Sequence, residues 1–264
     1  AAHLAGNMMT ADRILGDRLR PSTRALIREQ IEAKVLRPFE TRITTGIDVY
    51  WWVRVTHNWN SVCLASILAL ALYLRNRRRD RAWYVALTQR LIEYSERGFT
   101  ESGFYTEGVG YWGYGFGHYV VASELVRAAT GGRIDWYEKP LVRRMSTFGE
   151  RMMVRPGVYP TYADCRRDTK PPAWLVHWRN NRFDPGRMDR RTVEPIDPLE
   201  GIRYNAAVPL TLVLFGQVDP DACSGCETCL DRCEMDAVTM NDDGVSGIDP
   251  DRCIQCGNCA THCV

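Results

Sequence analysis

The residues best suited to chemistry are cysteines close to the end of the chain. Eight of the ten cysteines follow one spacing that occurs twice, as two runs of four. The first run is Cys223, Cys226, Cys229 and Cys233, and the second is Cys253, Cys256, Cys259 and Cys263. A thiolate at every third residue allows a loop to fold around a cube of iron and sulfide. The spacing therefore predicts iron–sulfur ligation.

Zinc and disulfide bonds are the alternative uses of these cysteines. Zinc sites favour two separated Cys-x-x-Cys pairs, whereas each run here contains four cysteines by itself. Disulfides suit small secreted domains, but cysteines this closely spaced pair poorly with one another. Small residues between the ligands fit iron–sulfur chemistry better, because they let backbone N–H groups approach inorganic sulfur. These residues are Ser224, Gly225, Gly257 and Asn258.

The doubled run, from about residue 218 to 264, resembles the two-cluster bacterial-type [4Fe–4S] ferredoxins. In that family the fourth cysteine of each run binds the cluster of the other run. The resemblance implies one [4Fe–4S] centre held by Cys223, Cys226, Cys229 and Cys263. It implies a second centre held by Cys253, Cys256, Cys259 and Cys233. The implied function is electron transfer.

The segment between the two runs predicts a small hairpin, with strands at 237–240 and 245–248 and a tight turn at 241–244. The ferredoxin resemblance also implies a hairpin beside each cluster. The chain departs from the family where a proline usually follows the fourth cysteine, because Glu234 and Val264 stand there. The family's closing strand after Cys263 is also missing. A ligand at the chain end predicts a less durable cluster.

Charge is divided unevenly along the chain. From Val218 onward there are ten acidic residues against Arg232 and Arg252, a net charge of −8. The preceding residues then carry +10, because the whole chain has a net charge of +2. An acidic ferredoxin-like part predicts docking to a redox partner protein with a basic face. No nucleic acid partner is expected, since the arginines are scattered and the dense run 75–81 predicts a solvated turn.

The first two hundred residues predict a mainly helical structure. Helical periodicity covers 25–39, ending near Pro38, and then 61–75, 81–97, 119–130 and 138–154. Strand signals are nearly absent before Pro209. Helix pairs joined by short turns favour an array of α-hairpins or a toroid. No membrane span is expected, because the longest apolar run, 62–74, has about half the residues that a crossing helix needs.

Two stretches that we expect to be loops are polar and aromatic, and they lie where core helices are expected to begin. They are residues 51–61, WWVRVTHNWNS, and residues 105–115, YTEGVGYWGYG. Together with the order of helices around them, they resemble the heparinase II/III-like and alginate-lyase-like polysaccharide lyases. The resemblance extends from about residue 7 to 215. It implies a partial (α/α) toroid that cleaves an acidic, uronic-acid polysaccharide by β-elimination.

The lyase resemblance also implies roles for individual residues. Asn58 would neutralise the sugar carboxylate, and Tyr114 would transfer the proton. Such a tyrosine needs a nearby cation to lower its pKa from about 10, and Arg54 and His57 are candidates. The residues implied to bind substrate are Trp59, Asn60, Glu107, Tyr111 and Trp112.

Structural roles remain open for the same residues. Trp51, Trp52, Trp59 and Trp112 could fill the core, and Asn58 and Asn60 could cap the helix expected near Ser61. Four glycines, at 110, 113, 115 and 117, could serve close packing alone. Cys63 is expected in the core, and Cys165 has no evident partner.

The sequence thus predicts two domains, a helical domain at 1–215 and a two-cluster domain at 216–264. Lyases of this kind continue into a large β-rich domain, so we expect a fragment or a fusion, with an exposed apolar flank. The preferred interpretation is an iron–sulfur electron carrier, and the alternative is a polysaccharide lyase. Oxygen-sensitive clusters favour the cytoplasm, whereas a lyase would favour the periplasm or secretion.

Overall fold

A computed structural model describes residues 2–184, 225–233 and 236–249 of the chain. The chain divides into two compact units, Ala1–Ile196 and Asp197–Val264. The domain boundary expected at 215/216 lies outside the described residues and stays a prediction. Each unit is described by itself below.

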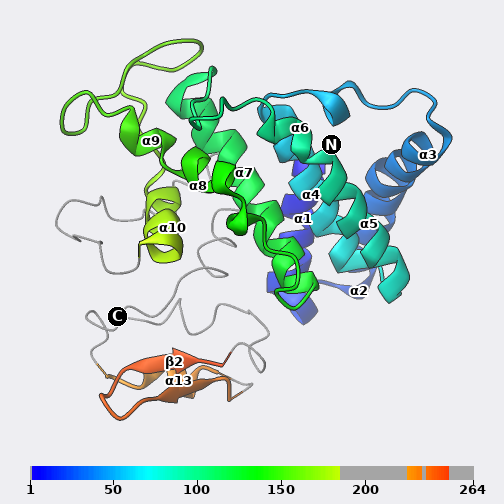
Figure 1. The fold of residues 1–264 in the computed structure, drawn as a ribbon. Coiled ribbons are helices and arrows are strands. Elements are labelled where there is room, and N and C mark those ends of the chain that lie inside the picture. The colour runs from blue at the N-terminus through cyan, green and yellow to red at the C-terminus, as the bar shows by residue number, and fades with distance from the viewer. Residues whose placement is uncertain (1, 185–224, 234–235, 250–264) are drawn as a thin grey trace. The chain divides into compact units, whose positions relative to one another are not determined.

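The first unit is mainly helical, as the sequence predicts (Figure 1). Its helices are α1 (Ala2–Leu15), α2 (Pro21–Ile31), α3 (Arg37–Thr45), α4 (Asn58–Leu74), α5 (Arg78–Leu91), α6 (Glu93–Glu96), α7 (Gly108–Ala129), α8 (Pro140–Ser146), α9 (Phe148–Arg151) and α10 (Ala173–Phe183). Sequence periodicity missed α1 and α10. β-type pairing in the described part of this unit is limited to two isolated bridges, Phe99 to Tyr105 and Arg155 to Val158.

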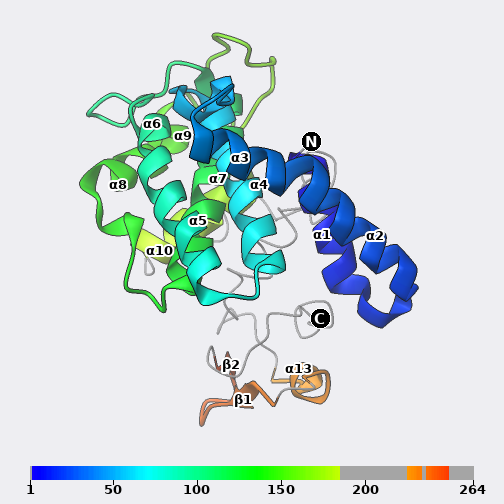
Figure 2. The same ribbon diagram turned by 90° about the vertical axis from the view of Figure 1, so that its right-hand side faces the viewer.

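The core of this unit is built around α4 and α7. These two helices pack along each other, and α1 and α5 both pack on α4 (Figure 2). Apolar residues occupy nearly every face of α4, which is typical of a helix surrounded by others. On α7, the rings of Trp112, Phe116 and Tyr119 form a buried stack, with centroid separations of 5.7 and 5.8 Å. No described helix is both long and apolar enough to cross a membrane.

Helix α7 begins earlier than the sequence predicts. The expected loop at 105–115 is wrong from Gly108 onward, because the helix starts there. Close packing explains the glycines. A Cβ atom on Gly113 would lie 2.7 Å from Pro172 Cδ, and one on Gly115 would lie 2.8 Å from Asn58 Cβ. Neighbouring residues therefore occupy the space that a side chain at either position would need. Close packing was one of the roles that the sequence left open for these glycines.

The predicted helix end near Pro38 is also wrong. Helical structure continues from α2 through a π-helical turn, η2 (Glu32–Leu36), into α3, which ends only at Thr45. Proline lacks an N–H donor, and its ring clashes with the preceding turn of a regular α-helix. The wider π turn directly before Pro38 accommodates that ring. The helix then stops at Gly46, which has a left-handed φ of 72°.

The second unit contains a short helix and a hairpin in its described residues. The helix is α13 (Thr228–Asp231), and the antiparallel strands are β1 (Val238–Met240) and β2 (Ser246–Ile248). In the turn, Asn241 Oδ1 accepts hydrogen bonds from the backbone N–H of Asp243 at 3.1 Å and of Val245 at 2.8 Å. Gly244 supplies the left-handed φ of 73°. The predicted hairpin is confirmed.

Candidate functional site

The cysteine runs fall partly outside the described residues. Cys223, Cys253, Cys256, Cys259 and Cys263 lie outside them, and Cys226, Cys229 and Cys233 lie inside. Within the described ranges, no three histidine, cysteine or carboxylate groups gather as a metal site would require. The predicted ligand sets therefore stay predictions. The structure nevertheless describes the backbone around three cysteines of the first run.

Left-handed residues shape the chain around these three cysteines. Gly225 has a φ of 66° and Glu227 a φ of 59°, so the chain turns sharply on both sides of Cys226 before α13 begins. A Cβ atom on Gly225 would lie 3.0 Å from the carbonyl oxygen of Gly244. The cysteine loop therefore packs directly against the turn of the hairpin.

Cys233 already accepts a backbone hydrogen bond. Its Sγ receives the N–H of Ala237 at 3.2 Å, across a turn in which Asp236 adopts a φ of 48°. Cys226 is exposed, and Cys229 and Cys233 are half-buried thiols. Thiols that can be reached, together with an N–H directed at sulfur, suit ligation of iron–sulfur clusters. The described residues therefore fit such a group.

The first unit holds a separate polar cluster at the start of α4. Glu107 Oε2 accepts the backbone N–H of Asn58 at 3.3 Å, the side-chain Nδ2 of Asn58 at 3.2 Å, and the hydroxyl of Tyr105. Asn58 and Tyr105 are both buried. Burial and the bond to Glu107 raise the pKa of Tyr105. Two of the lyase-like residues, Asn58 and Glu107, are thus brought together.

Tyr105 was missed in the sequence. Its position two residues before Glu107, in the same aromatic stretch, was the available signal. The capping alternative for the asparagines is wrong, because His57 occupies the N-cap position of α4 and Glu107 satisfies the first helical N–H. Asn60 is buried and donates Nδ2 to the carbonyl of Val53 at 2.8 Å.

The tryptophans divide between core and surface. Trp112 is 1% exposed and donates its Nε1 to the carbonyl of Met145 at 2.9 Å, so it serves the core. Trp52 is also buried. By contrast, Trp59 is 50% and Trp51 is 61% exposed, and their rings lie 5.4 Å apart beside His57. These two rings offer an aromatic surface next to Asn58.

Tyr111 and Tyr114 are both half-buried on α7. The ring of Tyr114 meets His118 edge-on, at 4.8 Å between centroids. Burial raises the pKa of Tyr114, and the nearby thiol of Cys63 adds to the rise. Proton abstraction at neutral pH needs the opposite shift. Arg54 and His57 were the cations expected to lower the pKa of Tyr114, yet that pKa is shifted upward.

Comparison with known proteins gives one short match. No protein-family model matches the chain. A 35-residue segment is 38% identical to a probable ferredoxin of Methanosarcina thermophila. The matched segment covers 13% of this chain and 60% of the length of that relative. The chain therefore contains a piece that is similar to a ferredoxin.

Proposed function

We propose that the C-terminal part of the chain is an iron–sulfur electron carrier that binds two [4Fe–4S] clusters. The duplicated cysteine spacing is the single observation that carries this proposal. Local similarity to a probable ferredoxin supports the iron–sulfur assignment. The N–H of Ala237, directed at Cys233, supports it further, because such bonds stabilise thiolate ligands. In this proposal Cys223, Cys226, Cys229 and Cys263 hold one cluster, and Cys253, Cys256, Cys259 and Cys233 hold the other.

A bound [4Fe–4S] cluster supplies a centre that gains and loses one electron. The residues of this chain would fix its position through the thiolates and tune its potential through N–H donors such as that of Ala237. Five exposed carboxylates lie in the same described segments as the three cysteines, and they would attract a redox partner with a basic face. These carboxylates are Glu227, Asp231, Asp236, Asp242 and Asp243. Oxygen-sensitive clusters fit a reducing cytoplasm.

The test is anaerobic reconstitution with iron and sulfide, followed by iron and sulfide analysis and electron paramagnetic resonance of the reduced protein. We expect about eight iron atoms per chain, four for each cluster. Cys233→Ser and Cys263→Ser should each impair a different cluster. Cys63→Ser and Cys165→Ser, outside both runs, are the matched controls and should keep the full count. A wild-type count of four or fewer would remove the two-cluster assignment.

A polysaccharide lyase is the second candidate. One observation favours it: the Asn58–Glu107–Tyr105 cluster, in which Asn58 and Tyr105 are buried, adjoins the exposed rings of Trp51 and Trp59. Aromatic surfaces suit sugar rings, and an amide could pair with a uronic acid carboxylate. The raised pKa of Tyr114 counts against its role as the base.

Incubation with uronic-acid polymers tests this second candidate. New unsaturated chain ends would absorb in the ultraviolet. The reaction should be lost in Asn58→Ala and Tyr114→Phe and kept in Glu138→Gln, an exposed site on another part of the unit. If neither wild type nor Tyr114→Phe produces this absorption on a broad panel of polymers, the lyase hypothesis is refuted.

A further inference from the structure

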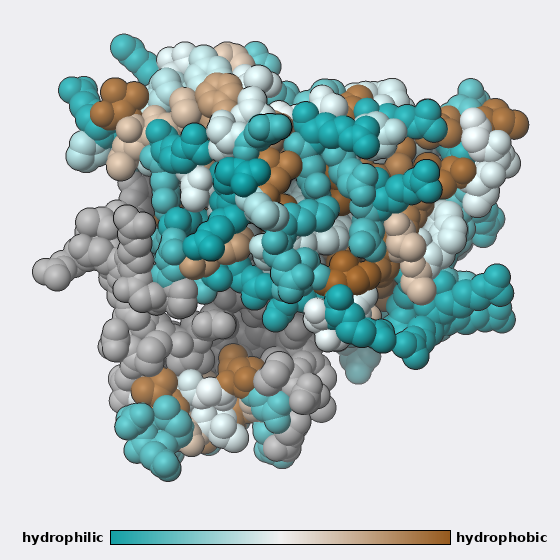
Figure 3. All heavy atoms as spheres, viewed as in Figure 1, coloured by the Kyte–Doolittle hydropathy of each residue, from teal (hydrophilic) through white to brown (hydrophobic). Residues whose placement is uncertain are grey.

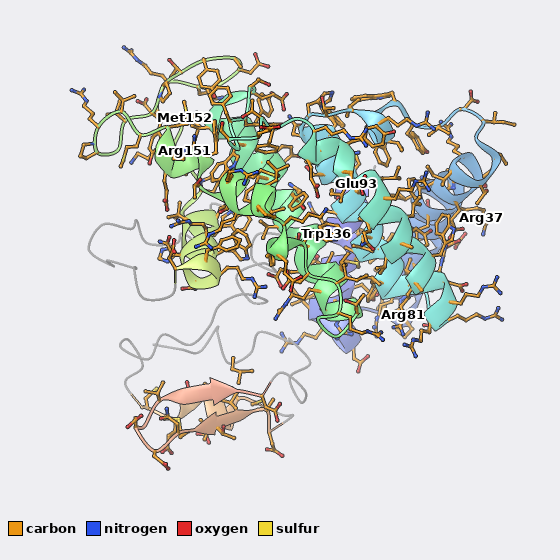
Figure 4. The ribbon with its side chains drawn as sticks, in the orientation of Figure 1. Arg37, Arg81, Glu93, Trp136, Arg151 and Met152 are labelled. Carbon is orange, nitrogen blue, oxygen red and sulfur yellow. The ribbon has the colours of Figure 1, made fainter. Side chains whose placement is uncertain are left out.

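Four arginines form a dense, exposed group at the turn between α4 and α5. They are Arg77, Arg78, Arg79 and Arg81, and we call them the arginine patch. Figure 4 labels Arg81, in the first part of α5. The space-filling view shows that the helical part is largely hydrophilic on this face (Figure 3). The exposed ring of Trp83 adjoins the patch in sequence.

The local physics of a helix disfavours this arrangement. The N-terminus of a helix carries a partial positive charge, so cations in the first turn are repelled. Asp80 is the one carboxylate in the first turn of α5, and the N-cap residue Arg77 makes no side-chain capping bond. Like charges this close in sequence also repel one another. An anionic surface that covered the patch would therefore relieve this electrostatic repulsion.

The arginine patch has no such cover within its own unit. Among the described residues, none of its four arginines forms an ion pair, whereas neighbouring Arg75 pairs with Glu32 at 2.6 Å and with Glu40 at 2.8 Å. Arg75 thus forms ion pairs within the helical unit, whereas the arginines of the patch form none in its described part. These four guanidinium groups are available to a partner.

The complementary surface occurs on the same chain. We call the described residues 225–233 and 236–249 the acidic segment. It carries the five exposed carboxylates given above, at residues 227, 231, 236, 242 and 243, against a single arginine, Arg232. Asp242 and Asp243 stand side by side in the hairpin turn. Clustered carboxylates and clustered guanidinium groups form charge-assisted hydrogen bonds, often in pairs.

We propose that the arginine patch of one molecule binds the acidic segment of a second molecule. The two surfaces differ, so after one contact forms, one molecule still has an unused acidic segment and the other an unused patch. Such heterologous contacts build rings where the rotation between copies closes and open chains where it does not. The expected result is salt-sensitive association whose average size rises with protein concentration. This inference goes beyond the proposed electron-carrier function.

Sedimentation equilibrium of the full-length chain, after anaerobic reconstitution, tests the proposal. At low ionic strength, about 0.01 M, charges are screened only beyond roughly 30 Å, and the weight-average mass should rise with concentration. At about 1 M salt, where screening acts within roughly 3 Å, the mass should fall to that of one chain. The patch variant Arg77→Gln/Arg78→Gln/Arg79→Gln/Arg81→Gln should remain a single chain at both salt concentrations.

A matched control removes the same charge elsewhere. Arg13, Arg18, Arg20 and Arg37 are exposed and form no ion pair among the described residues, so their fourfold replacement by glutamine should leave association intact. A second variant neutralises the acidic segment with Asp231→Asn/Asp242→Asn/Asp243→Asn. It should also stay a single chain, but a mixture with the patch variant should form a 1:1 complex, since one complementary contact remains. Circular dichroism verifies that each variant is folded.

Three results would overturn the inference. One is a constant single-chain mass for wild type at low salt. Another is an equal loss of association in the patch and control variants, which would indicate a general charge effect. The last is a mixture of the two neutralised variants that forms no complex. None of these results depends on the number of iron atoms bound, so they leave the cluster assignment untouched.

Discussion

At the scale of single residues, Glu107 has more polar partners than any sequence pattern reveals. One of its oxygens accepts two bonds from Asn58 and one from Tyr105. Helices leave their first N–H groups without internal partners, and here a carboxylate from a distant loop satisfies one of them. The negative charge also lies at the positive end of α4. Glu107 therefore stabilises the fold whether or not Asn58 contacts a substrate.

Replacement of Glu107 tests this structural role. Glu107→Gln keeps an acceptor oxygen and should lower the free energy of unfolding by about 1 kcal/mol, while Glu107→Ala leaves buried donors unpaired and should cost about 2–4 kcal/mol. Urea denaturation followed by circular dichroism at 222 nm measures both. The exposed control Glu138→Gln should change stability by less than about 0.5 kcal/mol. Equal effects of all three substitutions would refute the role.

Asp12 is a fully buried carboxylate, and it joins three helices. It accepts bonds from Arg24 at 2.7 Å and Arg28 at 3.1 Å on α2, and from the hydroxyl of Tyr73 on α4. Burial by itself would raise the pKa of Asp12. The bonds from Tyr73 and the two arginines outweigh burial, so the pKa lies below the usual value.

This shift predicts a pH dependence of stability. A carboxylate with a lowered pKa in the folded state stabilises the fold fully above its unfolded pKa, about 3.9. That contribution is lost as pH falls through the lower, folded value. Asp12→Asn should therefore cost about 2–3 kcal/mol near neutral pH, and less below pH about 4.

Urea denaturation of wild type and Asp12→Asn from neutral to acid pH measures this difference. Asp17→Asn is the control, because Asp17 also pairs with Arg24, at 3.1 Å, but is fully exposed. Its stability should stay close to that of wild type at every pH, because an exposed ion pair is screened by solvent. A stability difference for Asp12→Asn that stays constant into acid would contradict the assignment.

At the scale of elements, packing decides where α7 begins and how closely it approaches α4. Four glycines within eight residues, at 110, 113, 115 and 117, discourage a helix, since each costs about 1 kcal/mol relative to alanine. Packing against neighbouring residues nevertheless favours the helix at these glycines. Ser61 donates to the carbonyl of Gly115 at 2.7 Å, which holds the two helices together where no side chain separates them.

Gly115→Ala tests the close contact between α4 and α7. The added methyl group would lie 2.8 Å from Asn58 Cβ and 3.1 Å from Asn58 Cα, so backbone must move. The free energy of unfolding should fall by about 1–3 kcal/mol despite the better helix propensity of alanine. Gly6→Ala in α1 is the control, because nothing lies within 4 Å of its added Cβ. It should raise stability by about 0.5–1 kcal/mol. Thermal unfolding distinguishes these opposite signs.

At the scale of the whole molecule, the two units have different sources of stability. The buried apolar core described above lies in the helical unit, whereas the described part of the second unit is a short helix and a two-stranded hairpin. Isolated two-stranded hairpins are marginally stable in water. Bound clusters would supply the missing stabilisation, because metal binding and folding are coupled in small metal-binding domains.

Removal of iron should therefore affect the two units unequally. In reconstituted protein, chelation should make the C-terminal unit sensitive to limited proteolysis. The main helical transition at 222 nm should shift by less than about 2 °C, since its core contains none of the eight ligands. Gly115→Ala should lower that transition with or without iron. A common large shift on chelation would instead show that both units unfold together.

The sequence by itself determined the helical class, the hairpin at 237–248 and the doubled spacing of the cysteine runs. Each depends on local information: apolar periodicity, turn residues such as Asn241 and Gly244, and thiols at fixed spacing. It could not predict the start of α7 or the passage of Pro38 through a continuous helix. Both depend on space, the first on Asn58 and Pro172 and the second on a widened π turn.

The tertiary structure alone decided which polar residues meet. Asn58 and Glu107 are 49 residues apart, and Asp12 and Tyr73 are 61 apart, so no local pattern could pair them. It also decided which aromatic residues face water, since Trp112 and Trp59 look equivalent until their surroundings are known. The spacing of the cysteines along the chain is part of the covalent sequence and does not depend on how the chain packs. Burial and long-range hydrogen bonds exist only once the helices have packed against one another.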